Sequence, residues 1–256
     1  MKENGIPAEG IRINKYLSEA GVCSRRAADR EIEAGNVRIG DRVAVCGDRV
    51  EPGMQVYFRG EPVQTQEKEI LIAFHKPVGI VCTAEKREKD NIIDYINYPV
   101  RIYPVGRLDK NSEGLILLTN QGDLVNRVMR AGNFHEKEYV VTVDHDITDE
   151  FLEGMRSGVY LEELGVTTRR CMVERKNRRT FSMVLTQGYN RQIRRMCEVF
   201  GYRVRRLVRV RIMNIRLGDL APGTYRDVTE AEKRELYRLI RDSYSAPRTG
   251  GQRGTA

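Results

Sequence analysis

Apolar and polar residues at the start of the chain follow a helical period and then an alternating one. Ile13 and Tyr16 fall on one face of a predicted helix, for which Gly21 is a suitable end. Ser24 can cap a second helix that reaches Gly35. Beyond Gly35 apolar residues alternate with polar ones between frequent turn residues, which predicts short strands joined by tight turns.

The rest of the chain mixes strand-like and helix-like patterns. Apolar runs predict strands at 70–74, 80–83, 115–119, 139–143 and 181–185. Helices are expected after cap residues at Asp123 and Thr148, over 190–200, and after a capping box that joins Thr229 to Glu232. This part of the chain therefore contains both helices and strands.

The length and the distribution of Gly and Pro suggest two domains. A chain of 256 residues has room for one or two domains. A polar stretch that contains Gly60 and Pro62 is the best candidate for a linker. We expect a mobile tail at 1–10, a first domain at 11–60, a linker at 61–68, a second domain at 69–245 and a disordered tail at 246–256.

The charge balance predicts an anionic partner. The net charge is +8, and no apolar run approaches the roughly 20 residues that span a bilayer, so nucleic acid is favoured over a membrane. The N-terminus lacks an apolar signal core, and the five cysteines include no C-x-x-C pair. We therefore expect a cytoplasmic protein with reduced thiols. The three histidines are scattered, and no dinucleotide loop or P-loop is present, so neither a metal nor a cofactor is expected.

Two clusters of arginine are candidates for phosphate contacts. Cations at a helix N-terminus oppose the helix dipole, so Arg25, Arg26 and Arg30 near the start of the second predicted helix favour a phosphate-binding face over a merely solvated one. The second cluster lies between Thr186 and Leu217, where only Glu198 opposes it, and it indicates RNA or DNA binding. Its members are Arg191, Arg194, Arg195, Arg203, Arg205, Arg206, Arg209, Arg211 and Arg216.

Asp109 is the candidate for chemistry. It follows Gly106-Arg107-Leu108 and precedes Lys110, in a polar loop just ahead of a predicted strand. Taken alone, an aspartate there is an ordinary turn residue. Its cationic neighbours favour the ionised form, which can act as nucleophile, general base or metal ligand. Only Glu113 offers a second carboxylate nearby, which weakens the metal alternative.

Several segments together resemble the RsuA/RluB/RluE/RluF group of pseudouridine synthases. Residues 11–58 resemble an S4 RNA-binding domain, and the remaining motifs follow in the order found in that group. These motifs are Gly106-Arg107-Leu108-Asp109 with Glu113-Gly114-Leu115, Lys137-Glu138-Tyr139, and Gly188-Tyr189-Asn190-Arg191-Gln192-Ile193-Arg194-Arg195-Met196. The segments 122–126, 130–133 and 135–139 are most similar to the RluF branch, which acts on large-subunit (23S) rRNA.

The resemblance implies a fold, a reaction and a set of site residues. The fold would be α/β (α+β): a small S4 domain followed by a catalytic domain on a mixed, largely antiparallel sheet. The reaction would isomerise uridine to pseudouridine without a cofactor, in 23S rRNA and with a tRNA uridine as a further candidate. Asp109 would be the nucleophile, Arg194 its partner and Tyr139 the aromatic neighbour of a flipped-out base. The protein would be a monomer. Neighbouring nucleotides would be held by Arg107, Leu108, Lys110, Tyr189, Asn190, Arg191 and Gln192.

Three alternatives stay open. The chain could be a non-catalytic, S4-type RNA-binding or ribosome-associated factor. It could be a metal-dependent nuclease or phosphotransferase that uses Asp109 and Glu113, which would require divalent ions. Finally, the same isomerisation could act on small-subunit rRNA or tRNA.

Overall fold

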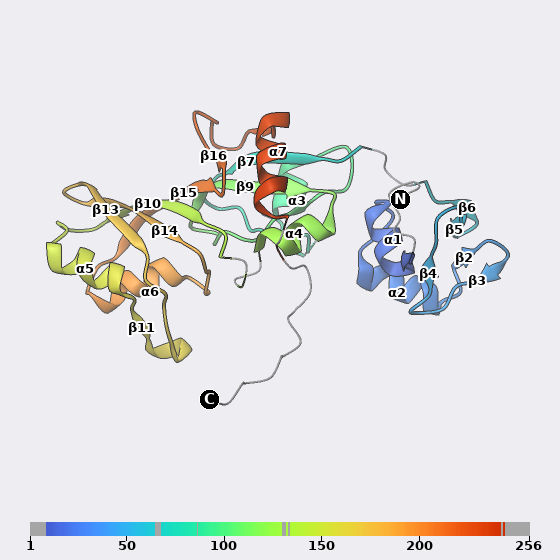
Figure 1. The fold of residues 1–256 in the computed structure, drawn as a ribbon, viewed down its shortest axis with the longest axis horizontal. Helices are drawn as coiled ribbons and strands as arrows, with labels where there is room; N and C mark the ends of the chain where they lie inside the picture. The colour runs from blue at the N-terminus through green and yellow to red at the C-terminus, as the bar shows by residue number, and fades with distance from the viewer. Residues whose placement is uncertain are drawn as a thin grey trace. The chain divides into compact units, whose positions relative to one another are not determined.

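The computed structural model describes residues 9–64, 68–85, 87–129, 132, 134–241 and 243. The chain divides into two compact units, Met1–Glu69 and Ile70–Ala256, which we describe separately (Figure 1). The tail expected at 246–256, and all but the last two residues of the tail expected at 1–10, lie outside the described residues.

The first unit packs two helices against short strands. Ser24 caps the second helix by accepting a hydrogen bond from the Ala27 amide at 3.2 Å, as expected. Ile13, Leu17 and Val37 lie in its buried core. The helices are α1 (Ile13–Glu19) and α2 (Arg25–Glu33). Strand β1 (Ile11–Arg12) pairs with β4 (Arg49–Val50). A separate sheet has the order β3 (Arg42–Val43), β2 (Val37–Ile39), β5 (Val56–Phe58) and β6 (Glu61–Pro62).

Two expectations for this unit need correction. Residues 61–68 were expected to be a linker, but Glu61–Pro62 form β6, because Pro62 lies opposite Tyr57 in an antiparallel pair. Arg30 lies in the last turn of α2 rather than near its start, where a cation is favourable to the helix dipole. The dipole cost therefore applies to Arg25 and Arg26 alone.

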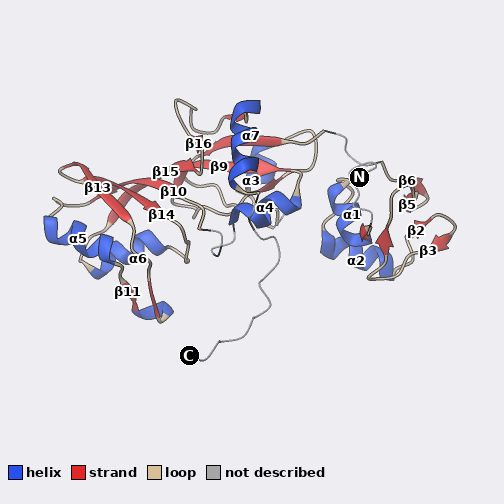
Figure 2. Ribbon diagram, viewed as in Figure 1, coloured by secondary structure: helices blue, strands red, loops and turns tan. Residues whose placement is uncertain are grey.

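A single large sheet forms the centre of the second unit (Figure 2). All strand pairs along it are antiparallel except β15 with β9, so the expected mixed, largely antiparallel sheet is confirmed. The order is β13 (Met172–Asn177), β14 (Thr180–Leu185), β10 (Lys137–Val143), β15 (Val204–Ile212), β9 (Glu113–Thr119), β7 (Leu71–Lys76) and β17 (Tyr225–Asp227), with β8 (Tyr103–Pro104) beside β9 and β16 (Ile215–Arg216) beside β15.

Helices cover both faces of this sheet. Neighbouring residues of β9 point to opposite faces, so Ile116 joins one apolar core and Leu117 the other. The first core includes side chains of α3 (Ile92–Ile96), α5 (Asp149–Ser157) and α6 (Gln192–Val199), and the second includes those of α4 (Gly122–Met129) and α7 (Glu230–Leu239). Figure 1 shows α5 and α6 against β10, β13 and β14, and α7 beside β7 and β9. A short hairpin of β11 (Tyr160–Leu161) and β12 (Val166–Thr167), with the 3-10 turn Glu162–Leu164 between its strands, completes the unit.

Local signals predicted some elements of the second unit and not others. The caps at Thr148 and Thr229 are confirmed, and the latter forms the full capping box. The strand expected at 80–83 is wrong: only Val81 makes an isolated bridge, to Asn91. Asp123 lies within the first turn of α4 rather than at its cap. The helix expected over 190–200 begins later, at Gln192.

Candidate active site

The turn that carries Asp109 lies between β8 and β9 and is fastened along its length. The Arg107 carbonyl accepts a bond from Arg209 at 3.4 Å, and the Leu108 amide donates to the Cys82 sulfur at 3.3 Å. The Lys110 carbonyl accepts a bond from the Gly79 amide at 2.8 Å. Residues distant in the sequence thus fix the backbone on both sides of Asp109.

Arg194, on α6, closes the same turn. Its Nη2 donates to the Asn111 carbonyl at 2.8 Å and to Ser112 Oγ at 3.4 Å, while the Ser112 amide donates to the Asp109 carbonyl at 3.0 Å. Within the described part of the chain, no ion pair joins Arg194 to the Asp109 carboxylate. Arg194 therefore holds the backbone of the turn.

The electrostatic surroundings of Asp109 are cationic. Burial lowers the pKa of Arg194, and the charge of Arg191 lowers it further, whereas the charge of Asp109 acts in the opposite direction. Burial likewise lowers the pKa of Lys76, with Cys82, Asp109 and Glu113 acting against it. Lys76 is fully buried and donates to the Pro77 and Ile80 carbonyls at 2.8 and 2.7 Å. Asp109 is itself half-buried, so it lies within reach of this charge and of solvent.

Tyr139 lies two strands away from the start of β9. It is opposite Arg209 on β15, and Arg209 is opposite Gly114 on β9. A Cβ on Gly114 would lie 2.4 Å from the Arg209 carbonyl oxygen, so only glycine allows these two strands to approach so closely. Tyr139 is 9% exposed and belongs to the same apolar cluster as Leu108, the residue before Asp109. The tyrosine is thus part of the core beneath the turn.

Two more buried cations lie on these strands. Arg209 is 2% exposed and donates from Nε to the Leu115 carbonyl at 2.7 Å. Burial, with a smaller contribution from the charge of Arg209, lowers the pKa of Lys137 to about 8. The Lys137 ammonium donates to the His135 carbonyl at 3.1 Å. Sequence reasoning assigned no site role to Lys76 or Lys137 and took Arg209 for a phosphate contact; no local pattern shows that these three side chains are buried.

The structure places the expected RNA contacts at both exposed and buried positions. Arg107, Tyr189, Asn190, Arg191, and Arg25, Arg26 and Arg30 of the first unit are exposed. Lys110 is exposed and pairs with Asp90 at 2.9 Å. Leu108 and Gln192 are buried instead. The Gln192 Oε1 accepts a bond from the Tyr189 amide at 3.0 Å, so this side chain shapes the loop rather than facing solvent.

The second arginine cluster is less uniform than its sequence suggests. Glu198 is the only acidic residue within the segment, but carboxylates from other segments also oppose the cluster: Glu113 pairs with Arg206 at 2.5 Å, and Glu136 and Glu138 pair with Arg211 at 3.0 and 2.8 Å. Glu163 pairs with Arg195. Pairing of β15 with β9 and β10 brings Glu113, Glu136 and Glu138 in from distant segments, whereas Glu163 lies on the 3-10 turn between β11 and β12. Exposed positions that suit phosphate are Arg191, Arg203, Arg205 and Arg216.

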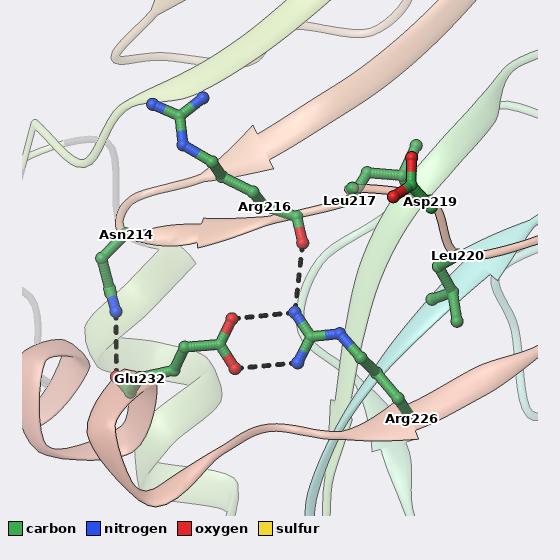
Figure 3. Close-up of a pocket in the computed structure, with 8 residues that line it drawn as sticks. Asn214, Arg216, Leu217, Asp219, Leu220, Arg226 and Glu232 are labelled. Atoms are coloured by element: carbon green, nitrogen blue, oxygen red, sulfur yellow. Dashed lines mark hydrogen bonds and ion pairs between the residues drawn. The ribbon is translucent and has the colours of Figure 1, made fainter.

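A separate hollow of about 360 Å³ lies next to α7 (Figure 3). Two hydrogen bonds of 2.8 Å join Arg226 to the Glu232 carboxylate there, and Asn214 donates to the Glu232 carbonyl at 2.9 Å. The hollow shares no residue with the Asp109 turn, and its polar groups chiefly anchor α7. We therefore place the candidate chemistry at the turn.

Two further features concern the part of the chain that the structure describes. No three His, Cys, Asp or Glu side chains come close enough together in that part of the chain to hold a metal ion. Among the helices that the structure describes, none has both the length and the apolar character required to cross a bilayer.

Comparison with known families identifies the class of protein. Residues 70–199 match the model of the RNA pseudouridylate synthase family, and residues 11–56 match the S4 domain. A solved structure described as a pseudouridylate synthase superposes with a TM-score of 0.65 at 25% identity, covering 88% of this chain and 99% of the other. The chain belongs to the RNA pseudouridine synthases that carry an N-terminal S4 domain.

Individual relatives narrow the comparison. The dual-specificity RNA pseudouridine synthase RluF of Escherichia coli (strain K12) is 52% identical over 242 residues, covering 94% of this chain and 83% of RluF. An uncharacterized RNA pseudouridine synthase of Aquifex aeolicus (strain VF5) is 34% identical over 90% of this chain and 95% of its own length. The similarity to RluF extends through both units of the chain.

Proposed function

We propose that this protein isomerises specific uridines of large-subunit (23S) rRNA to pseudouridine, with Asp109 as the nucleophile on a flipped-out uridine. The observation that supports the proposal best is the fastening of the Asp109 turn. Hydrogen bonds donated by Gly79, Arg194 and Arg209, and one accepted by the Cys82 sulfur, fix its backbone, while no ion pair in the described part of the chain engages the Asp109 carboxylate. A carboxylate held in this way is preorganised to attack a substrate.

The reaction conserves atoms and electrons. The bond between C1′ and N1 of the uridine breaks, the uracil rotates, and a bond between C1′ and C5 replaces the first one. Asp109 forms a transient bond to the sugar or to the base during the exchange and is released at the end. The proton on C5 passes to a base, for which we propose the half-buried Asp109 carboxylate, and N1, which no longer bonds the sugar, takes up one proton, so the product is an isomer of uridine.

The residues around Asp109 have distinct roles in this proposal. Arg194 is a positioning residue for the turn, because it donates to the Asn111 carbonyl two residues after Asp109. Tyr139 would pack against the extruded uracil from the core beneath Leu108. Exposed Arg107 and Arg191 would hold the flanking phosphates.

The choice of RNA also belongs to the proposal. RluF is named as a dual-specificity RNA pseudouridine synthase, and its similarity to this chain supports RNA as the substrate and more than one target. We propose 23S rRNA as one target and a tRNA uridine as a second. The S4 unit would add a second RNA contact and raise the effective concentration of substrate at the catalytic unit.

The direct test replaces the carboxylate. Asp109→Ala should abolish pseudouridine formation in an unmodified 23S rRNA transcript, while RNA affinity should stay within a few-fold of the wild type. Asp90→Asn is the matched control. Asp90 pairs with Lys110, the residue after Asp109, but it has no role in the proposed reaction. Pseudouridine can be mapped by carbodiimide labelling and reverse transcription. Unchanged pseudouridine formation in Asp109→Ala would remove the catalytic claim.

The target is tested in cells. Deletion of the gene should remove particular pseudouridines from 23S rRNA, and the wild-type gene should restore them. Loss confined to small-subunit rRNA would contradict the proposed target and leave the proposed chemistry intact.

A further inference from the structure

The side chain of Phe134 is exposed in an unfavourable backbone conformation. Its φ is +56°, a left-handed value that bulky residues rarely adopt, and its side chain is 59% exposed. The fold therefore gains little buried apolar area from a residue that strains the backbone. Such outliers are found preferentially at functional positions.

A cation supports the Phe134 ring from one side. The guanidinium carbon of Arg169 lies 4.1 Å from the ring centroid, which is a close cation–π contact. The backbone next to Arg169 is held in place, because the preceding residue, Thr168, is buried and forms two hydrogen bonds of 2.9 Å with Val159. At its other end, the guanidinium donates to Thr186 Oγ1 at 3.5 Å. One face of the ring is thus covered, and the high exposure leaves the other available.

Both side chains of the pair are connected to the start of β10, the strand that carries Tyr139. Phe134 precedes Tyr139 by five residues, which limits the distance between their Cα atoms to about 17 Å. Thr186 follows Leu185, the cross-strand partner of Lys137 at the start of β10. The chain then runs through exposed Tyr189 into α6.

We propose that the open face of Phe134, supported by Arg169, stacks on an unpaired nucleobase of the RNA close to the target uridine. Proteins recognise single-stranded RNA by stacking its bases on aromatic rings and guanidinium planes. Because a paired duplex offers no free base face, this contact selects substrates in which the nucleotides beside the target are unstacked. The inference rests on the proposed function, and it adds a specificity determinant to the same site.

Fluorescence provides the test, because the chain contains no tryptophan. Phe134→Trp introduces a single reporter, and Asp109→Asn in the same protein prevents turnover. Addition of an unmodified Escherichia coli 23S rRNA transcript should quench the tryptophan, whereas a fully paired RNA duplex should not. Tyr160→Trp in the same background is the matched control, since Tyr160 is also 59% exposed, and its fluorescence should not change. No quenching at position 134, or equal quenching at both positions, would overturn the proposal.

A second variant separates binding from folding. Glycine suits the left-handed conformation, so Phe134→Gly should fold normally. Its Kd for the transcript should rise by about tenfold, within the range expected for loss of one stacked base, while Tyr160→Ala should bind as the wild type does. Wild-type affinity in Phe134→Gly would sink this inference alone, whereas a wild-type protein that forms no pseudouridine would sink the proposed function.

Discussion

Lys137 should make the stability of this protein depend on pH in a way that one substitution can isolate. Lys137 lies on β10 between Leu185 and Ile212 of the neighbouring strands and is 6% exposed. Burial lowers its pKa from 10.5 to about 8, with a further contribution from Arg209. The folded state therefore binds this proton more weakly than the unfolded state does.

The sign and the size of the effect follow from these values. Below pH 8 the buried Lys137 ammonium lowers the free energy of unfolding by its full amount. Between about pH 8 and 10.5 this destabilisation disappears, because Lys137 loses its proton at a lower pH in the folded state than in the unfolded state. A shift of about 2.5 pH units corresponds to about 3 kcal/mol. The free energy of unfolding of the wild type should thus rise by about 3 kcal/mol relative to Lys137→Met over this range.

Urea denaturation followed by circular dichroism measures this difference. Wild type, Lys137→Met and the control Lys176→Met should be compared at steps from pH 7 to pH 10.5. Lys176 is exposed on β13, so the control makes the same chemical change without removing a buried charge. At each pH, the free energy of unfolding of the variant is subtracted from that of the wild type, which cancels the contribution of the other titrating groups. The reasoning would be refuted if the difference in the free energy of unfolding between the wild type and Lys137→Met stayed constant with pH. It would also be refuted if that difference changed with pH as it does for Lys176→Met.

Two further substitutions test the packing around the site and the last helix. Gly114→Ala should destabilise the catalytic unit by about 3 kcal/mol or more, because its φ is +109° and the added Cβ would meet the Arg209 backbone at 2.4 Å; a loss below 1 kcal/mol in urea denaturation would show that β9 and β15 can move apart. Thr229→Ala should cost about 1 kcal/mol by removing the cap on the Glu232 amide, and Thr229→Ser should retain most of the stability; equal melting temperatures for both variants would contradict the role of the cap.

Local chemistry predicted much of the secondary structure. Ser24, Thr148 and Thr229 each cap a helix as expected, because a cap depends only on residues within one turn. The short helix α3 was not predicted, since its five residues follow a charged stretch that resembles a loop. The second arginine cluster was interpreted by charge alone, although four of its nine members lie on the central strand β15.

The candidate site was only partly predictable. Asp109, Arg194 and Tyr139 were predicted as site residues because they belong to motifs that resemble a known family. The buried cations Lys76 and Arg209 were not assigned to the site, because their surroundings come from segments far along the chain. Arg209, for example, contacts the Arg107 carbonyl across 102 residues. Burial of this kind is a property of the sheet order and has no local signal.

The fastening of the Asp109 turn has a consequence for synthesis of the chain. Two hydrogen bonds that clamp the turn come from residues that the ribosome adds much later than the turn itself. Arg194 donates to the Asn111 carbonyl across 83 residues, and Arg209 donates to the Arg107 carbonyl across 102 residues. A nascent chain that has already made β9 and β10 still lacks both clamps. Under the proposed function, a product terminated before β15 would carry the motifs around Asp109 and Tyr139 but lack the hydrogen bond from Arg209, and we expect it to be inactive.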